Sequence, residues 1–208
     1  MTRPLPAPRE ARPPAAGAVV VFDLMGTLLH DPYRTAYAEA AGRTFEEFDR
    51  ARSPALYDRF ERGVIDEDEY WRGLRAAGVD LDVPRFHALR RGGYHWLDGM
   101  RSVLDGCCAV RRTVVGSNYP VWIKDVLPLL PDRVAGVFAS CDLGARKPDP
   151  RFYLRLARRV GCSPADLVLV DDKPENVRAL REMGGEGIHH VSAGNTIMAL
   201  EMIFDFPE

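Results

Sequence analysis

Lysine is scarce in this chain of 208 residues: among its 28 basic residues, only Lys124, Lys147 and Lys173 are lysines. The arginines are scattered and are balanced by 30 acidic residues, which leaves a formal net charge of -2. Proteins that bind nucleic acids or anionic membranes usually carry a one-sided positive charge. No nucleic-acid or membrane partner is therefore expected, and any lysine that falls inside a motif is notable.

Long apolar segments are missing as well. No stretch approaches the roughly 18 consecutive apolar residues that cross a membrane as a helix. The first 17 residues are rich in proline, arginine and alanine and lack the apolar core of a secretory signal. We expect residues 1–17 to be a disordered leader, and their many prolines oppose the amphipathic helix of a transit peptide.

Cysteine is equally sparse, and its positions suggest neither a metal site nor a disulfide framework. Two of the four cysteines are the neighbours Cys107 and Cys108, and no pair has the spacing of metal ligands. A chain of this size can build its core without disulfides. Reduced thiols in a cytoplasmic protein are expected.

Short valine-rich runs recur along the chain, each bounded by polar or turn residues. These runs cover residues 19–22, 113–115, 136–139, 167–170 and 188–191. Unbroken rather than alternating apolarity is typical of strands covered on both faces, as in parallel sheets. Helical patterns separate the runs, such as the one that begins at Asp149-Pro150 and ends before Gly161. The alternation predicts an α/β fold with a Rossmann-like parallel sheet and helices on both faces.

The segment from residue 31 to residue 97 interrupts this alternation, because it contains no convincing strand. Four helices are expected there, over residues 33–41, 45–60, 66–77 and 84–94. The third opens with a capping-box pattern that runs from Asp66 to Glu69. We predict a small all-α cap domain, residues 31–97, inserted into a core domain formed by residues 18–30 and 98–208.

Polar side chains stand where the predicted strands end, and ligands bind at the carboxyl ends of parallel strands. Asp23 follows the first run directly, and Gly26 and Thr27 come shortly after it. The other strand ends carry Ser117-Asn118, Lys147 in the loop 144–148, and Asp171-Asp172. A carboxylate, hydroxyls, an ammonium group and a pair of acids together supply the chemistry of phosphoryl transfer.

In their order along the chain, four segments resemble the motifs of the haloacid dehalogenase-like hydrolase superfamily. The resemblance is to phosphatase-type members that have a helical cap after the first strand. The matching segments are 19–28 (VVVFDLMGTL), 115–118 (VGSN), 147–150 (KPDP) and 170–176 (VDDKPEN). Each segment is short and weak by itself, but four in the family's order strongly indicate the fold.

The resemblance implies a catalytic role for several residues. Asp23 would be the nucleophile that takes up a phosphoryl group as an aspartyl-phosphate. Ser117 would hydrogen-bond the transferring group, and Lys147 would neutralise charge beside the nucleophile. Thr27 and Asn118 would bind the substrate, which is expected to be a small phosphorylated metabolite.

The resemblance also implies a magnesium cofactor. Asp172 would bind Mg²⁺, with Asp171 as a second ligand or an orienting neighbour. Asp23 and the backbone carbonyl of Met25 would complete the protein contacts. Hard oxygen ligands of this kind are those that Mg²⁺ prefers.

Met25 is where the chain departs from the family's pattern. Phosphatase-type members usually have an aspartate there, which protonates the leaving oxygen and later activates water. A thioether can do neither, and loss of a general acid or base commonly lowers a rate by about 10²–10⁴. Either the substrate has a good leaving group, or another side chain supplies the proton, or the site binds a ligand without turning it over. His30, in the linker to the cap, is the first candidate for the second hypothesis, and His95 is the next.

Two other functions remain open. One is a metal-independent haloacid dehalogenase, which needs no acid at Met25 but suits the acidic pair Asp171-Asp172 poorly. The other is a catalytically weakened protein that binds a phosphorylated ligand. The favoured prediction is an Mg²⁺-dependent hydrolase that transfers phosphoryl groups through Asp23 and works as a monomer or homodimer.

Overall fold

A computed structural model describes residues 17–204 of the chain, and in it five parallel strands form one sheet in the order β3-β2-β1-β4-β5. The strands are β1 (Val19–Phe22), β2 (Thr113–Ser117), β3 (Val137–Ala139), β4 (Leu167–Asp171) and β5 (Glu186–His189). The predicted α/β class with a parallel sheet is confirmed. Of the predicted leader, residues 1–16 lie outside the described residues.

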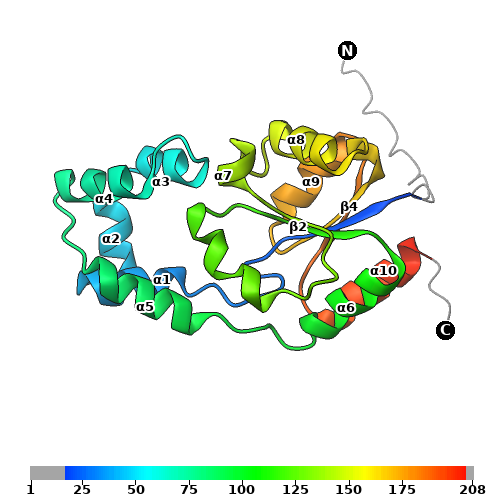
Figure 1. The fold of residues 1–208 in the computed structure, drawn as a ribbon, viewed down its shortest axis with the longest axis horizontal. Helices are drawn as coiled ribbons and strands as arrows, with labels where there is room; N and C mark the ends of the chain where they lie inside the picture. The colour runs from blue at the N-terminus through cyan, green and yellow to red at the C-terminus, as the bar shows by residue number, and fades with distance from the viewer. Residues whose placement is uncertain (1–16, 205–208) are drawn as a thin grey trace, which may run out of the picture.

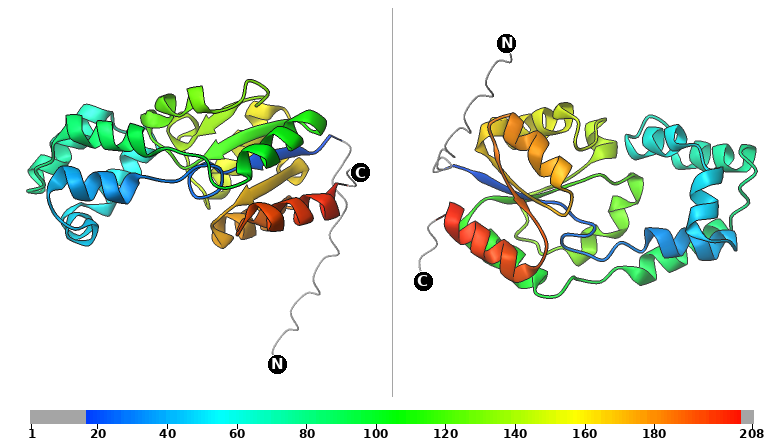
Figure 2. Two further views of the ribbon diagram at one scale, coloured as in Figure 1. Left: turned by 90° about the horizontal axis from the view of Figure 1, so that it is seen from below. Right: turned by 180° about the vertical axis from the view of Figure 1, so that it is seen from behind.

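Helices cover both faces of the sheet, which explains the unbroken apolar runs. Val20 and Phe22 of β1 belong to an apolar cluster with α6 (Met100–Val110) and α10 (Ala193–Ile203). Val19 and Val21 pack in a second cluster with α8 (Pro150–Val160) and α9 (Pro174–Glu182). Figures 1 and 2 show the two helix pairs on opposite sides of the sheet. Successive strand residues point to opposite faces, so both must be apolar when both are covered.

The register of the central strand brings three strand ends together. Phe22 of β1 lies beside Val115 of β2 on one side and Val170 of β4 on the other. Because the strands are parallel, the residues that follow these positions emerge at the same edge of the sheet. The polar segments predicted to carry the site therefore start from neighbouring places.

Five helices lie together at one end of the molecule, beyond that edge of the sheet (Figure 1). They are α1 (Tyr33–Ala41), α2 (Phe45–Ala51), α3 (Pro54–Glu61), α4 (Glu67–Ala76) and α5 (Val83–Gly93). Their interior is aromatic: Tyr37 stacks on Phe48, and Phe60 stacks on Tyr70. None of the helices among residues 17–204 is both long and apolar enough to span a membrane.

A tryptophan from the sheet domain enters this aromatic interior. Trp122 lies on the short helix η1 (Val121–Asp125) and stacks on Trp71 of α4 with ring centroids 5.7 Å apart. Its indole N–H donates a hydrogen bond of 2.7 Å to Glu67 Oε1. The five helices are thus packed against the rest of the chain by a shared aromatic core as well as by the two linkers. The remaining short elements are η2 (Leu127–Leu129), α7 (Ser140–Leu143) and η3 (Pro164–Asp166).

Several predicted elements have different bounds in the structure, and two of the differences have a clear physical reason. The single helix predicted over residues 45–60 is two helices, because Arg52 and Ser53 are extended and Pro54 starts α3. Proline disfavours helical backbone in the residue before it, so a helix usually ends there. The strand predicted over residues 188–191 is β5, which pairs with β4 from Glu186 to His189. Pairing with β4, rather than the apolar run, sets where β5 begins and ends.

Candidate active site

The turn after β1 places Asp23 at the sheet edge and closes against the acidic loop after β4. The Asp23 amide donates to the Val170 carbonyl at 2.8 Å, and the residue is only 6% exposed. Gly26 has φ +84°, and a Cβ there would lie 2.8 Å from Asp172 Oδ2. Glycine is required at this position by its backbone conformation and by the close approach of the carboxylate. The Asp172 amide donates to Thr27 Oγ1 at 3.1 Å, so Thr27 holds the acidic loop in place.

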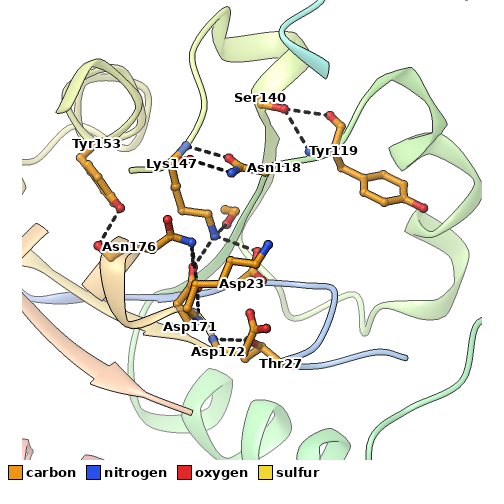
Figure 3. A network of polar contacts seen from close by, with 12 residues as sticks. Asp23, Thr27, Asn118, Tyr119, Ser140, Lys147, Tyr153, Asp171, Asp172 and Asn176 are labelled. Carbon is orange, nitrogen blue, oxygen red and sulfur yellow. Dashed lines mark hydrogen bonds and ion pairs between the residues drawn. The ribbon is translucent and has the colours of Figure 1, made fainter. Parts of the chain in front are cut away.

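Lys147 is buried at the centre of the site, with its ammonium between two carboxylates (Figure 3). Its Nζ donates to Asp23 Oδ1 at 2.7 Å, to Asp171 Oδ2 at 2.6 Å and to the Gly116 carbonyl at 2.7 Å. A lysine has three donors, and all three are used. The ammonium group of Lys147 thereby holds the ends of β1, β2 and β4 together.

Asn118 fixes the loop that carries Lys147. Its side-chain Nδ2 donates to the Lys147 carbonyl at 2.8 Å, and its Oδ1 accepts from the Lys147 amide at 2.7 Å. Both ends of the amide side chain are occupied by this backbone, as Figure 3 shows. Asn118 therefore positions the backbone of Lys147.

Asp171 is similarly committed to partners inside the protein. Besides Lys147, it accepts hydrogen bonds from the Lys173 amide at 2.9 Å and from Asn176 Nδ2 at 2.9 and 3.0 Å. Asn176 is held in turn by Tyr153 of α8, whose hydroxyl donates to the Asn176 carbonyl at 2.7 Å. Nothing in the sequence marks Tyr153 as the tyrosine that reaches the next helix.

The donor set fits a divalent cation that prefers oxygen. Asp23, Asp171 and Asp172 each offer a carboxylate oxygen, and these atoms lie within 4.8 Å of one another. Asp172 Oδ1 is buried and has no hydrogen-bond partner among residues 17–204. Lys147 forms ion pairs with Asp23 and Asp171, whereas Asp172 has no ion pair among residues 17–204, so the three acids carry more negative charge than Lys147 balances. A hard cation of charge two would balance this excess and use the free oxygen of Asp172.

The electrostatics of the cluster reflect the same excess. Burial raises the pKa of Asp23 to about 6, with Asp171 and Asp172 adding to the shift and Lys147 opposing it. Burial, followed by the charge of Asp171, also raises the pKa of Asp172. For Lys147, burial disfavours the ammonium, but Asp23 and Asp171 outweigh it and raise its pKa. The cluster therefore keeps Lys147 charged, but this one ammonium does not neutralise all of the negative charge of the carboxylates.

The other predicted site residues lie at different distances from this cluster. Ser117 is buried at the end of β2, one residue after the carbonyl that Lys147 contacts. Met25 is 9% exposed, and its side chain belongs to the apolar cluster of the core. His30 is exposed and stacks on His95 with ring centroids 4.6 Å apart. It lines a hollow of about 660 Å³ together with residues of α1 and α5 such as Thr35 and Arg85. None of the three clustered acids lines that hollow.

A charged contact holds the helical end of the molecule beside the Lys147 loop. Arg146 Nε lies 2.9 Å from Glu61 Oε2 of α3, as an ion pair without the alignment of a hydrogen bond. Ser140 Oγ donates to the Glu61 carbonyl at 2.6 Å. Both contacts join α3 to segments next to the sheet edge where Asp23 lies, and neither could be inferred from the spacing of these residues in the sequence.

Comparison with known proteins identifies relatives along most of the chain. A family model of haloacid dehalogenase-like hydrolases matches residues 18–184. Flavin mononucleotide hydrolase 1 of Arabidopsis thaliana is 34% identical over 174 residues, which cover 82% of this chain and 71% of the relative. A sesquiterpene phosphatase of Aspergillus oryzae is 39% identical over 158 residues, 71% of this chain and 78% of the relative. A phosphoglycolate phosphatase of Xylella fastidiosa is 32% identical over 183 residues, 79% of this chain and 76% of the relative.

Solved structures show the same fold at lower identity. A HAD-like hydrolase from Porphyromonas gingivalis matches 93% of this chain and all of its own, with a TM-score of 0.73 and 23% identity. A HAD family enzyme from Bacteroides thetaiotaomicron, in complex with magnesium and inorganic phosphate, matches 85% of this chain and 95% of its own. Its TM-score is 0.68 at 17% identity. From its sequence matches, the chain belongs to the haloacid dehalogenase-like hydrolase family and is an enzyme of its phosphatase type.

Proposed function

We propose that the protein is an Mg²⁺-dependent phosphatase that hydrolyses a small phosphorylated metabolite through an aspartyl-phosphate on Asp23. The observation that carries this proposal is the cluster of buried Asp23, buried Asp171 and half-buried Asp172 beside Lys147, with its excess of negative charge and the free Oδ1 of Asp172. A phosphoryl-transfer site needs a carboxylate nucleophile beside a fixed positive charge and oxygen ligands for Mg²⁺.

Each residue near the cluster has a part in this proposal. Asp23 attacks phosphorus, and Lys147 stabilises the negative charge around the transferring group. Ser117, at the end of the neighbouring strand, donates a hydrogen bond to that group. Thr27 and Asn118 act by holding Asp172 and Lys147, in line with their observed hydrogen bonds.

Mg²⁺ fits the donors that the cluster leaves open. Asp23, Asp172 and the backbone carbonyl of Met25 would hold the ion, which when bound would offset the charge of the substrate phosphate. Asp171 is the less suitable ligand of the three acids, because Lys147, Lys173 and Asn176 already use its oxygens. We therefore assign Asp171 the orienting part and Asp172 the ligand part.

We further propose that residues 31–97 form a cap domain that helps to select the substrate. The names of the relatives supply the first substrates to test: flavin mononucleotide, a sesquiterpenyl phosphate and phosphoglycolate. We propose a cytoplasmic protein that acts as a monomer or homodimer, with no nucleic-acid or membrane partner. The name of the Arabidopsis relative includes a chloroplast location, which we do not transfer to this chain.

Mg²⁺ together with beryllium fluoride, an analogue of the phosphoryl group, should stabilise the chelator-treated protein. A ligand at 100 times its Kd adds about 2.7 kcal/mol to the free energy of unfolding, which a thermal melt detects. Asp172→Asn should remove this gain, because it neutralises the acid that has a free oxygen. Asp80→Asn, at an exposed position in a turn of the helical end, is the matched control and should keep the gain. The proposal fails if the wild type gains nothing, or if Asp172→Asn gains as much as the control.

Haloacid dehalogenation and binding without turnover are the competing functions. A metal-free dehalogenase must hold an anionic substrate, and the surplus of carboxylates beside Asp23 opposes this. Release of halide from a 2-haloacid without metal would favour that function. Binding of beryllium fluoride with no hydrolysis of any phosphate ester would favour the function of binding without turnover.

A further inference from the structure

The proposed phosphatase lacks a proton donor at Met25, and the linker to the helical end supplies another acid near the site. The two linkers run side by side between the sheet and the five helices (Figure 1). The His30 amide donates to the His95 carbonyl at 2.9 Å, and the Leu97 amide donates to the Leu28 carbonyl at 2.9 Å. Leu29 and Trp96 form an antiparallel bridge between them. These pairings hold the backbone of the first linker beside the second.

Neighbouring residues of this linker face different surroundings. Successive side chains of an extended segment point to opposite sides, and Asp31 precedes Pro32, which favours extended backbone. His30 stacks on His95 and lines the hollow beside α1 and α5. The carboxyl of Asp31 instead interacts electrostatically with Lys173 and Asp172, which follow β4 at the catalytic edge.

Two tyrosine hydroxyls mark the same side of the linker. Tyr94 and Tyr119 lie with their hydroxyl oxygens 2.7 Å apart, and the negative charge of Asp31 reaches both. Tyr119 follows Ser117-Asn118 at the end of β2. The Gly26 amide donates to the Leu29 carbonyl at 2.8 Å, so the linker that carries Asp31 begins against the turn that follows Asp23.

The Asp31 carboxyl is held in one orientation and keeps one oxygen open. Its Oδ1 accepts a hydrogen bond of 3.0 Å from the Tyr33 amide. Within residues 17–204, no hydrogen bond engages Oδ2. An acid that is fixed by one oxygen and open at the other can exchange a proton with a bound substrate or water.

The surroundings also favour the protonated form of this acid. Although the side chain reaches solvent, the nearby protein removes enough water to raise the pKa of Asp31, and Asp172 adds to the shift. The Tyr33 amide, Lys173 and His30 oppose it. A general acid must hold its proton near the working pH, so a raised pKa suits this role.

Building on the proposed function, we propose that Asp31 is the general acid and base that stands in for the missing acid at Met25. Asp23 attacks phosphorus, and the bond from phosphorus to the leaving oxygen breaks. That oxygen takes the proton of Asp31, which leaves Asp31 as a carboxylate. Water then attacks the aspartyl-phosphate and gives its proton to Asp31, the bond to Asp23 breaks, and orthophosphate is released with both acids restored.

Asp31→Asn tests this assignment, since asparagine keeps an oxygen that accepts from the Tyr33 amide but carries no acidic proton. The substrates are flavin mononucleotide and glycerol 3-phosphate, which have alcohol leaving groups, and 4-nitrophenyl phosphate, which has a good one. We expect kcat/KM on the two alkyl esters to fall by about 10²–10⁴. With 4-nitrophenyl phosphate, a rapid burst of about one nitrophenolate per enzyme should remain, followed by slow turnover, because activation of water is lost. The wild-type rate on alkyl esters should fall at high pH, where Asp31 loses its proton. This fall should be missing from the pH profile of Asp31→Asn.

Two further variants sharpen the comparison. Asp98→Asn, at an exposed acid at the end of the second linker, is the matched control and should behave as the wild type. His30→Asn tests the competing histidine, and a larger loss there than in Asp31→Asn would overturn the assignment. Wild-type rates in Asp31→Asn, or equal loss of the nitrophenolate burst and of alkyl-ester hydrolysis, would do the same. If the wild type with Mg²⁺ hydrolyses none of the three esters, the proposed function falls as well.

Discussion

Asp23→Asn should lower kcat/KM for any phosphate ester that the wild type hydrolyses by about 10⁴–10⁶-fold, as expected for loss of a covalent nucleophile. The asparagine amide has the shape of the carboxylate but cannot form an aspartyl-phosphate. Release of orthophosphate under saturating Mg²⁺ measures the effect, and Asp23→Ala serves as a second variant because it cannot revert by deamidation. A rate near that of the wild type in both variants would contradict the assignment of Asp23.

The same substitution should not unfold the protein, and its effect on stability should depend on pH. The pKa of Asp23 is raised from 3.8 to about 6 in the folded state, chiefly by burial. Protonation of Asp23 therefore favours folding, so its contribution is full below its unfolded pKa and is lost as the pH rises through the folded pKa. In chelator, Asp23→Asn should gain free energy of unfolding relative to the wild type between about pH 4 and pH 7. Denaturant titrations at several pH values measure the difference, and a constant difference would contradict the raised pKa.

Lys147→Met should have the largest effect on stability. The three hydrogen bonds of Lys147 go to Asp23, Asp171 and the Gly116 carbonyl, and methionine can replace none of them. Removing one partner of a buried ion pair costs about 3–5 kcal/mol of free energy of unfolding, because the remaining charge is left without a counterion. Activity should be lost with it, since no other positive charge is seen between Asp23 and Asp171 in the described part of the chain.

The loss in Lys147→Met should grow with pH. Without the ammonium, Asp23 loses the charge that lowers its pKa, so the cost is smallest where the Asp23 carboxyl is protonated. Lys124→Met, at an exposed position on η1, is the matched control and should leave the free energy of unfolding nearly unchanged. If Lys147→Met unfolds at the same denaturant concentration as the control, the ammonium does not hold the strand ends together.

The positions of the clustered side chains in the candidate site follow from short-range features of the sequence. Valine-rich runs set the strands, and parallel strands bring their ends to one edge. Asp23, Lys147 and Asp171 stand directly at those ends or in a loop beside them, so their meeting could be predicted. The helix break at Pro54 carried a local signal too, but the apolar pattern on both sides obscured it.

The direction of each side chain could not be predicted in the same way. Thr27 and Asn118 were expected to bind the substrate, yet their polar atoms bond the backbone of Asp172 and Lys147. In the linker, His30 was the first candidate acid because of its chemistry, and it lines a hollow that none of the three clustered acids lines. These outcomes depend on how two linkers pair and how loops pack, which involve contacts between residues distant in the sequence.

Chemical trapping of the enzyme during turnover tests the central claim most directly. The protein is mixed with Mg²⁺ and 4-nitrophenyl phosphate, quenched in acid at short times and reduced with borohydride, which converts an aspartyl-phosphate into homoserine. Peptide mass spectrometry then locates the modified residue. The account predicts homoserine at position 23, dependent on both Mg²⁺ and substrate. If the enzyme releases orthophosphate at its normal turnover rate while Asp23 is unmodified at every quench time, the account is contradicted.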